Sequence, residues 1–209
     1  MLGNLYDRAL VGERCWIRHD DGGVHRLPVR SWLGGRGTDE AFDNHLVALC
    51  SGLTIDLGCG PGRLVANLIR RGIPALGVDQ SATAVRLARH NGAPALHRDV
   101  FAPLPAVGRW QTVLLADGNV GLGGDPLRIL ARAGELLRRS GRCLAEFDPC
   151  VTGVRPRWVR LESSDTVGPW FRWASVGVDS AGRLAEQVGM ALTDVHRLGE
   201  RVVASLALP

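Results

Sequence analysis

Lysine is absent from this sequence of 209 residues, so arginine supplies all 25 of its basic side chains. The arginines are scattered among 21 acidic residues, and no basic run is longer than two residues. A nucleic-acid-binding surface usually carries a clustered basic patch or stripe. The net charge of +4 would suit a nucleic-acid partner, but the scatter of the arginines argues against one, and we expect them to form an ordinary solvated surface.

Cysteine is present in an odd number and without any C-x-x-C pair, which argues against a disulfide framework and against a zinc site. We expect no bound metal. The N-terminal residues lack the apolar stretch of a signal peptide, and no run approaches the roughly 20 apolar residues of a membrane span. These absences predict a soluble, cytoplasmic protein with no membrane partner, either a monomer or a homodimer.

What the sequence does contain is an alternation of short apolar runs with segments of helical periodicity, which is typical of βαβ units and a parallel sheet. The expected strands are residues 53–57, 75–78, 95–97, 110–116 and 142–147. Helices are expected after the glycine-rich turn at 58–62, at 82–90, and from Asp125-Pro126 to Ser140-Gly141. In the first helix Leu64, Val65, Leu68 and Ile69 should face the core, and in the third Leu127, Leu130, Leu136 and Leu137.

The segments outside this alternation predict additions to a doubly wound α/β core. Residues 151–178 alternate in polarity and predict an inserted β-hairpin, followed by a helix at 181–190. Residues 192–195 and 202–206 should pair as an antiparallel edge, which reverses the last strand. Residues 1–50 should form an N-terminal cap, with helices near Tyr6 and at 39–49 and a β-like stretch at 25–32. The cap and residues 51–209 together should make one structural domain of mostly parallel, seven-stranded architecture.

A glycine-rich turn lies between the first expected strand and helix, in the run Ile55-Asp56-Leu57-Gly58-Cys59-Gly60-Pro61-Gly62-Arg63. A doubly wound sheet binds nucleotide-like ligands at this kind of position, where glycines let the backbone approach the ligand closely. The pattern is G-x-G-x-G. The dinucleotide fingerprint G-x-G-x-x-G would need glycine in place of Arg63, so the turn does not match that class.

Two acidic residues flank this turn. Asp56 would repel a pyrophosphate but attract a ligand that carries an ammonium and a sulfonium group. Asp79 ends the second strand 21 residues after Gly58, at the spacing where a carboxylate accepts hydrogen bonds from two ribose hydroxyls. Each acid alone is as readily an ordinary strand-end residue, but the combination with the turn predicts a cationic nucleoside ligand.

With these residues in view, the chain resembles the class I S-adenosylmethionine-dependent methyltransferases over about residues 53–147. The resemblance implies that Asp56 and the turn hold the methionine end, that Asp79 holds the ribose, and that Asp99 meets the adenine amino group. It also implies that residues 114–119 border the methyl group. The residues expected to contact the cofactor are Asp56, Gly58, Cys59, Gly60, Gly62, Asp79, Gln80, Asp99, Val100 and Asp117.

The sequence departs from some members of this superfamily after the fourth strand. Asp117-Gly118-Asn119 is not the Asn/Asp-Pro-Pro-Tyr signature of methylases that act on exocyclic or glutamine amides. The absence of this signature disfavours a nucleic-acid base as the methyl acceptor. Asp117 and Asn119 are the candidate catalytic residues, and a general base, if the acceptor needs one, could be Asp117, Tyr6, His19 or His25.

The acceptor is expected to be a small molecule with an oxygen, nitrogen or carbon nucleophile. Tyr6, Trp170 and Trp173 are the candidate residues that line its pocket, although the tryptophans could equally pack the hairpin on the sheet. Since Trp170 and Trp173 are three residues apart, only one of them should face the pocket. The glycine-rich segment 117–124 should be a flexible loop beside the methyl group, with a gating role open to it.

Two other classes of function stay open at the level of sequence. One is a non-catalytic module that only binds S-adenosylmethionine, because a glycine turn indicates binding alone. The other is a nicotinamide-dependent oxidoreductase, which Asp56 and Arg63 disfavour.

Overall fold

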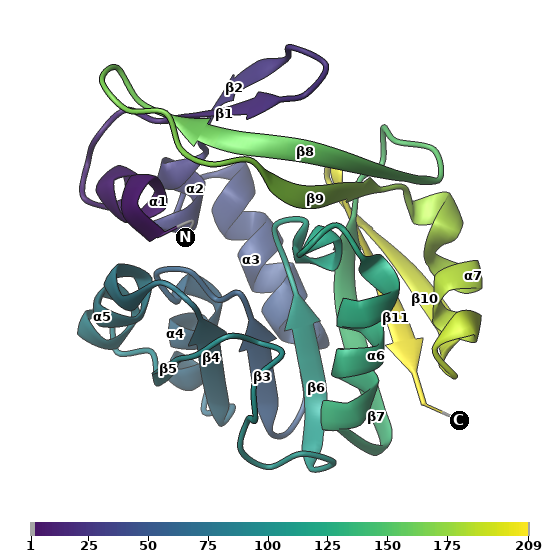
Figure 1. The fold of residues 1–209 in the computed structure, drawn as a ribbon. Coiled ribbons are helices and arrows are strands. Elements are labelled where there is room, and N and C mark those ends of the chain that lie inside the picture. The colour runs from purple at the N-terminus through teal and green to yellow at the C-terminus, as the bar shows by residue number, and fades with distance from the viewer. Residues whose placement is uncertain (1–2, 209) are drawn as a thin grey trace.

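The structure, a computed structural model, describes residues 3–208 and contains two sheets. A seven-stranded sheet forms the core, and a four-stranded sheet lies across the carboxyl ends of its central strands (Figure 1). The order of the core sheet is β10-β11-β7-β6-β3-β4-β5. Its strands are β3 (Thr54–Leu57), β4 (Ala75–Asp79), β5 (Ala95–His97), β6 (Trp110–Leu115), β7 (Leu137–Phe147), β10 (Ala191–Leu198) and β11 (Arg201–Ala207).

The core sheet is parallel except for β11, which runs antiparallel to both β7 and β10. This confirms the predicted doubly wound sheet with a reversed C-terminal strand. Strand β3 lies between β4 and β6, so the order of strands reverses direction at β3. In open α/β sheets, such a reversal opens a crevice at the carboxyl ends of the strands, where ligands bind.

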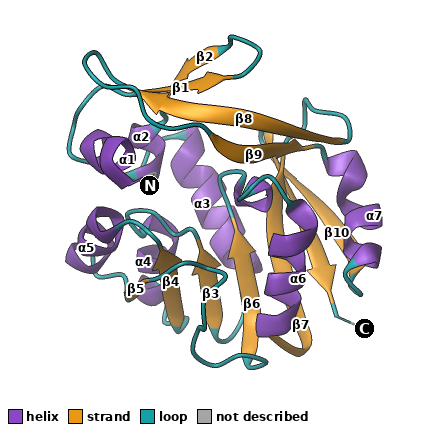
Figure 2. Ribbon diagram, in the orientation of Figure 1, coloured by secondary structure: helices purple, strands orange, loops and turns teal. Residues whose placement is uncertain are grey.

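Helices cover both faces of the core sheet (Figure 2). One face carries α3 (Thr38–Leu49), α4 (Arg63–Arg70) and α5 (Ala82–His90), and the other carries α6 (Pro126–Leu136) and α7 (Ala181–Gln187). Because side chains alternate along a strand, Ile55 and Leu57 pack toward α6 whereas Asp56 points to the α3 and α4 side. None of the helices within residues 3–208 is long and apolar enough to cross a membrane.

Several local predictions need correction. Helix α6 ends at Leu136, and Leu137 instead starts β7, where it pairs with Trp110 and is buried by sheet formation rather than by a helical face. Leu127 and Ile69 are exposed because they lie at the solvent edge of their helices. Helix α4, by contrast, begins at Arg63 directly after the turn, as expected, and Gly62 adopts a left-handed conformation at its N-cap.

The four-stranded sheet, called the lid sheet here, has the order β2-β1-β8-β9. It consists of β1 (Trp16–His19), β2 (Val24–Arg26), β8 (Val154–Glu162) and β9 (Phe171–Val176). The predicted hairpin is β8 and β9, and it joins the N-terminal strands because β1 pairs antiparallel with β8. The predicted β-like stretch at 25–32 is wrong beyond Arg26, because Val29–Trp32 forms the short helix α2.

Helix α1 (Gly3–Leu10) fills the space between the lid sheet and α5 (Figure 1). Leu5 and Ala9 pack in one hydrophobic cluster with Leu161 of β8. The next residues hold the helix on both sides: Asp7 accepts a hydrogen bond from Ser81 at the start of α5, and Arg8 pairs with Asp165 of the β8–β9 connection at 2.9 Å. The N-terminal helix therefore links the lid sheet to the core.

Candidate functional site

The turn after β3 places three glycines in left-handed backbone conformations, with φ of 80° at Gly58, 54° at Gly60 and 81° at Gly62. The backbone N–H groups of Gly58 and Cys59 both donate to the Val78 carbonyl, at 2.8 and 3.0 Å. These bonds fasten the turn to β4, so the turn and the end of β4 form one rigid wall of the crevice.

Two of the glycines allow close approach of neighbouring elements. A Cβ atom at Gly62 would lie 2.7 Å from Cβ of Ala88, so glycine is needed there for α4 to pack on α5. A Cβ atom at Gly60 would lie 3.2 Å from the hydroxyl oxygen of Tyr6. Helix α1 therefore brings Tyr6 to the glycine turn, and burial together with the charge of Asp79 raises the Tyr6 pKa well above its usual value.

Asp79 lies at the end of β4 and faces the same turn. Its two carboxylate oxygens accept hydrogen bonds from the backbone N–H groups of Gly60, at 2.9 Å, and Ser81, at 2.8 Å. Burial raises its pKa, although both backbone bonds oppose the rise. The structure thus brings the predicted ribose-binding acid directly against the glycine turn.

Asp56 is almost wholly buried at the base of the turn. Among residues 3–208, its Oδ1 atom has no hydrogen-bond partner. Burial raises its pKa to about 7, and the nearby Arg63 only partly offsets this rise. A buried carboxylate oxygen without a partner is costly, so the site fits a ligand that brings a positive or hydrogen-bond-donating group.

Asp117 follows β6 and adopts a left-handed backbone, with φ of 54°, which is unusual for a non-glycine residue. Arg63 binds its carboxylate through two hydrogen bonds, Nη1 to Oδ2 at 2.6 Å and Nη2 to Oδ1 at 3.0 Å. Arg201 at the start of β11 donates to Oδ1 at 2.8 Å. Burial opposes the ionisation of Asp117, but the charges of Arg63 and Arg201 outweigh it and lower its pKa.

This ion pair belongs to a longer series of charged residues. The series, called the five-residue network here, consists of Asp43, Arg63, Asp117, Arg201 and Glu146. Arg63 also donates from Nε to Asp43 at 2.9 Å, and Arg201 binds Glu146 through two hydrogen bonds of 2.6 Å. Four elements (α3, α4, β7 and β11) and the turn after β6 contribute one residue each. Sequence reasoning named Asp117 as a candidate site residue and used Arg63 only to exclude the dinucleotide fingerprint, but it missed Asp43, Arg201 and Glu146.

Asn119 locks the turn after β6 onto the turn after β3. Its Nδ2 donates to the carbonyl oxygens of Leu57 and Gly58, at 3.0 Å each. A Cβ atom at Gly58 would lie 2.6 Å from that nitrogen. The segment predicted as a flexible loop is instead a 3-10 turn at Asn119–Gly121 that packs on β9.

The remaining predicted site residues divide between the rim and the lid sheet. Val100 is buried near the end of β5, whereas Gln80 and Asp99 are exposed there, with the Asp99 carboxylate accepting from Phe101 N at 2.9 Å. Trp173 is half-buried and bridges to Leu122, beside the turn after β6. Trp170 precedes β9, is 42% exposed, and lies under the guanidinium of Arg160.

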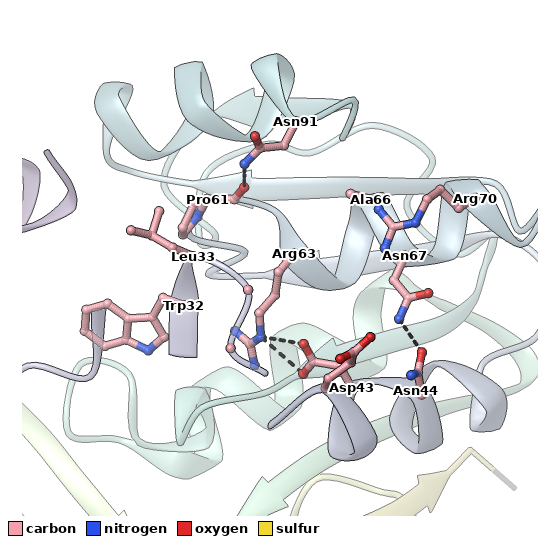
Figure 3. A pocket seen from close by; sticks show the side chains of 13 residues that line it. Trp32, Leu33, Asp43, Asn44, Pro61, Arg63, Ala66, Asn67, Arg70 and Asn91 are labelled. Carbon is pink, nitrogen blue, oxygen red and sulfur yellow. Dashed lines mark hydrogen bonds and ion pairs between the residues drawn. The ribbon is translucent and has the colours of Figure 1, made fainter. Parts of the chain in front are cut away.

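A polar pocket of about 410 Å³ opens beside this site, between α3, α4 and the segment that follows α2 (Figure 3). Its inner end is formed by Pro61 of the glycine turn and by the Arg63–Asp43 ion pair. Trp32 also lines the pocket, and its ring meets that of Tyr6 edge-on, with the ring centroids 5.6 Å apart. The pocket therefore connects solvent with one end of the five-residue network.

Comparison with known proteins gives a family match and a set of fold relatives. Residues 55–145 match the family model described as "Methyltransferase domain". This region runs from β3 to β7 and includes the glycine turn, Asp79 and Asp117. No curated protein matches the chain.

Among solved structures, an S-adenosylmethionine-dependent methyltransferase from Bacteroides fragilis, in complex with S-adenosylhomocysteine, superposes with a TM-score of 0.81 at 17% identity, covering 99% of this chain and 94% of that one. The 1,6-didemethyltoxoflavin-N1-methyltransferase of Burkholderia thailandensis gives 0.61 at 19% identity, covering 81% and 79%. The glycopeptide N-methyltransferase MtfA gives 0.60 at 15% identity, covering 84% and 89%. At these identities the likeness establishes a shared fold.

Proposed function

We propose that this chain, which carries a methyltransferase domain of the class I, Rossmann-like fold, transfers the methyl group of S-adenosylmethionine to a small-molecule acceptor. S-adenosylhomocysteine is the expected product. The related structures support this assignment, because all three hold S-adenosylhomocysteine and one of them also holds 1,6-didemethyltoxoflavin, a small molecule.

The observation that carries the proposal is the unpartnered Oδ1 of Asp56 at the base of the glycine turn. S-adenosylmethionine has an ammonium and a sulfonium group, and either would supply the positive charge that this buried carboxylate lacks. Asp79, whose carboxylate faces the glycine turn, would accept hydrogen bonds from the ribose hydroxyls. The glycine turn does not fit a pyrophosphate, which Asp56 would repel.

The chain's own residues would contribute to catalysis mainly by positioning the cofactor and the acceptor. Displacement at a sulfonium needs an in-line approach of the acceptor, and the leaving group is already good. Asn119 holds the turn after β6 against Gly58, and Arg63 with Arg201 fixes Asp117 there. Tyr6 lies against the glycine turn from α1, and the backbone of Trp173 in β9 pairs with Leu122 after β6, so α1 and the lid sheet would close the site over the cofactor and the acceptor.

The proposal is tested by incubating the purified protein with S-adenosylmethionine labelled with tritium in its methyl group and with a small-molecule extract of the producing cells. We expect S-adenosylhomocysteine to form and the label to pass to a small molecule. Binding of S-adenosylhomocysteine without transfer to any component would favour a non-catalytic binding module. Binding of NADH in its place would overturn the proposal.

A further inference from the structure

All three carboxylates of the five-residue network form ion pairs with guanidinium groups. Asp117 is held by Arg63 and Arg201, Glu146 by Arg201, and Asp43 by Arg63, at distances of 2.6 to 3.1 Å. The Glu146 carboxylate also accepts a hydrogen bond from the backbone N–H of Asp117 at 2.6 Å. A carboxylate that is paired in this way favours its ionised form and is a poor acceptor for a further proton.

The other titratable groups that face Asp117 from neighbouring elements are also unsuited to take a proton from an acceptor. Tyr6 of α1 is a buried phenol whose pKa is raised, so it carries its own proton at neutral pH. Asp56 of β3 is 2% exposed and points to the α3 and α4 side of the sheet, beneath the glycine turn. In the proposed complex its carboxylate faces the cofactor, so it is not available to take a proton from the acceptor.

The histidines considered from sequence lie on the lid sheet. The rings of His19 and His25 stack edge-on with centroids 5.3 Å apart. The charged groups that influence His19 are Arg157, Asp20 and Asp21, which belong to the lid sheet and its β1–β2 turn rather than to the β6 edge. Neither histidine therefore stands beside the turn after β6 in the described chain.

The local field favours positive charge. In the five-residue network three carboxylates face only two guanidinium groups, so the network carries an excess of acidic groups at this edge. A phenolate, carboxylate or thiolate nucleophile would meet repulsion at this edge. A nucleophile that begins neutral and becomes cationic would be stabilised during the transfer.

We propose that the acceptor atom is the nitrogen of a neutral amine, which uses no general base from the protein. This inference rests on the proposed function and narrows its acceptor class. An alcohol would need a base to remove its proton during attack, and the residues that face the turn after β6 do not offer one.

The reaction balances without a protein proton acceptor. The nitrogen lone pair attacks the methyl carbon, a nitrogen–carbon bond forms, and the carbon–sulfur bond breaks with its electron pair on sulfur. The products are a methylammonium ion and the neutral thioether S-adenosylhomocysteine. The ammonium ion then releases its proton to water after it leaves the site.

The first test locates the transferred methyl group. The wild-type protein is incubated with S-adenosylmethionine carrying a trideuterated methyl group and with a small-molecule extract of the producing cells, and labelled products are fragmented by mass spectrometry. We expect the label on nitrogen. A label on oxygen, carbon or sulfur overturns this inference but leaves the proposed function intact, whereas the absence of any labelled product removes both.

The second test uses that labelled acceptor in a pH series with the wild type, Asp117→Asn, and Glu13→Gln as a matched carboxylate control that pairs with Arg8 away from the site. We expect kcat/KM to rise with pH and to inflect at the pKa of the amine itself in all three proteins. Loss of the inflection in Asp117→Asn, with a decrease of about 10²- to 10⁴-fold, would identify Asp117 as a general base and overturn the inference.

Discussion

Arg63 and Asp117 join the start of α4 to the turn after β6 through two parallel hydrogen bonds of 2.6 and 3.0 Å. This bidentate pair is mostly shielded from solvent, and Arg63 uses its remaining Nε to bind Asp43. Because the guanidinium of Arg63 joins the start of α4 to the turn after β6, the pair should contribute to the stability of the fold and to the positions of the residues around the ligand.

Replacement of Arg63 by methionine should destabilise the fold by about 3–5 kcal/mol, because it leaves the buried Asp43 carboxylate without its partner. The midpoint of urea unfolding measures this loss. Arg8→Met is the matched control: Asp165 is exposed to solvent and stays solvated without its partner, so this variant should lower the midpoint less than Arg63→Met does. Equal midpoints for both variants would show that the five-residue network is not a stabilising element.

Replacement of Gly58 by alanine should weaken binding of S-adenosylhomocysteine at least about tenfold, or 1.4 kcal/mol. The new Cβ would lie 2.6 Å from Nδ2 of Asn119 and would force the two turns apart. Gly72→Ala is the control, because Gly72 has a similar φ of 75° but open space around it. It should lower stability without changing affinity, as measured by calorimetry.

The Gly58 effect should depend on Asn119. Adding Asn119→Ala to Gly58→Ala removes the atom that the new Cβ would meet, so the double variant should lose less affinity than the two single losses combined. Strictly additive losses would mean that the contact between the turns is unimportant and that the left-handed backbone alone requires glycine.

Asp56 should make stability depend on pH. Its folded-state pKa of about 7 lies above the unfolded value, so the folded protein holds the proton more strongly and loses stability as pH rises from about 4 to 7. Asp56→Asn lacks this titration. The free energy of unfolding of the variant, relative to that of the wild type, should therefore increase by a few kcal/mol over that window and then level off. Chemical denaturation between pH 5 and 8 measures the difference. A constant difference between the variant and the wild type would rule out a raised pKa.

The two tryptophans of the β8–β9 segment should differ in role. Trp173 is half-buried beside Leu122, so Trp173→Ala should raise the acceptor KM while leaving the affinity for S-adenosylhomocysteine within about threefold. Trp170 is exposed on Arg160, and Trp170→Ala should change neither quantity by much. A larger KM effect from Trp170→Ala would place the acceptor on the outer side of the lid sheet.

Local patterns in the sequence predicted the core of this fold well. Helix 82–90 and strand 95–97 have the bounds expected from caps and periodicity, and the pairing of β10 with β11 follows from two apolar runs around Gly199. The pairing of β1 with β8 could not be foreseen, because those strands are more than 100 residues apart and no local signal specifies which edges meet.

The residues of the site likewise divide into those that local sequence specifies and those that only long-range pairing brings together. Asp56, Gly58 and Asp79 were predictable because one turn and one strand end bring them together at fixed spacing. Arg201 and Glu146 were not, because each is an ordinary charged residue at a strand end until β11 folds back beside β7. Leu137 shows the converse error, since a leucine with helical spacing was buried by pairing with Trp110 instead.

The central claim is that an S-adenosyl ligand binds at the carboxyl edge between β3 and β4, and calorimetric titration with S-adenosylhomocysteine tests it most directly. We predict micromolar affinity for the wild type, and at least about a tenfold loss in Asp79→Ala, since a hydrogen bond to a charged group contributes roughly 1.5–3 kcal/mol. Asp194→Ala, at an exposed carboxylate on β10, should bind like the wild type. Unchanged affinity in a folded Asp79→Ala protein, or no binding by the wild type, would contradict the account.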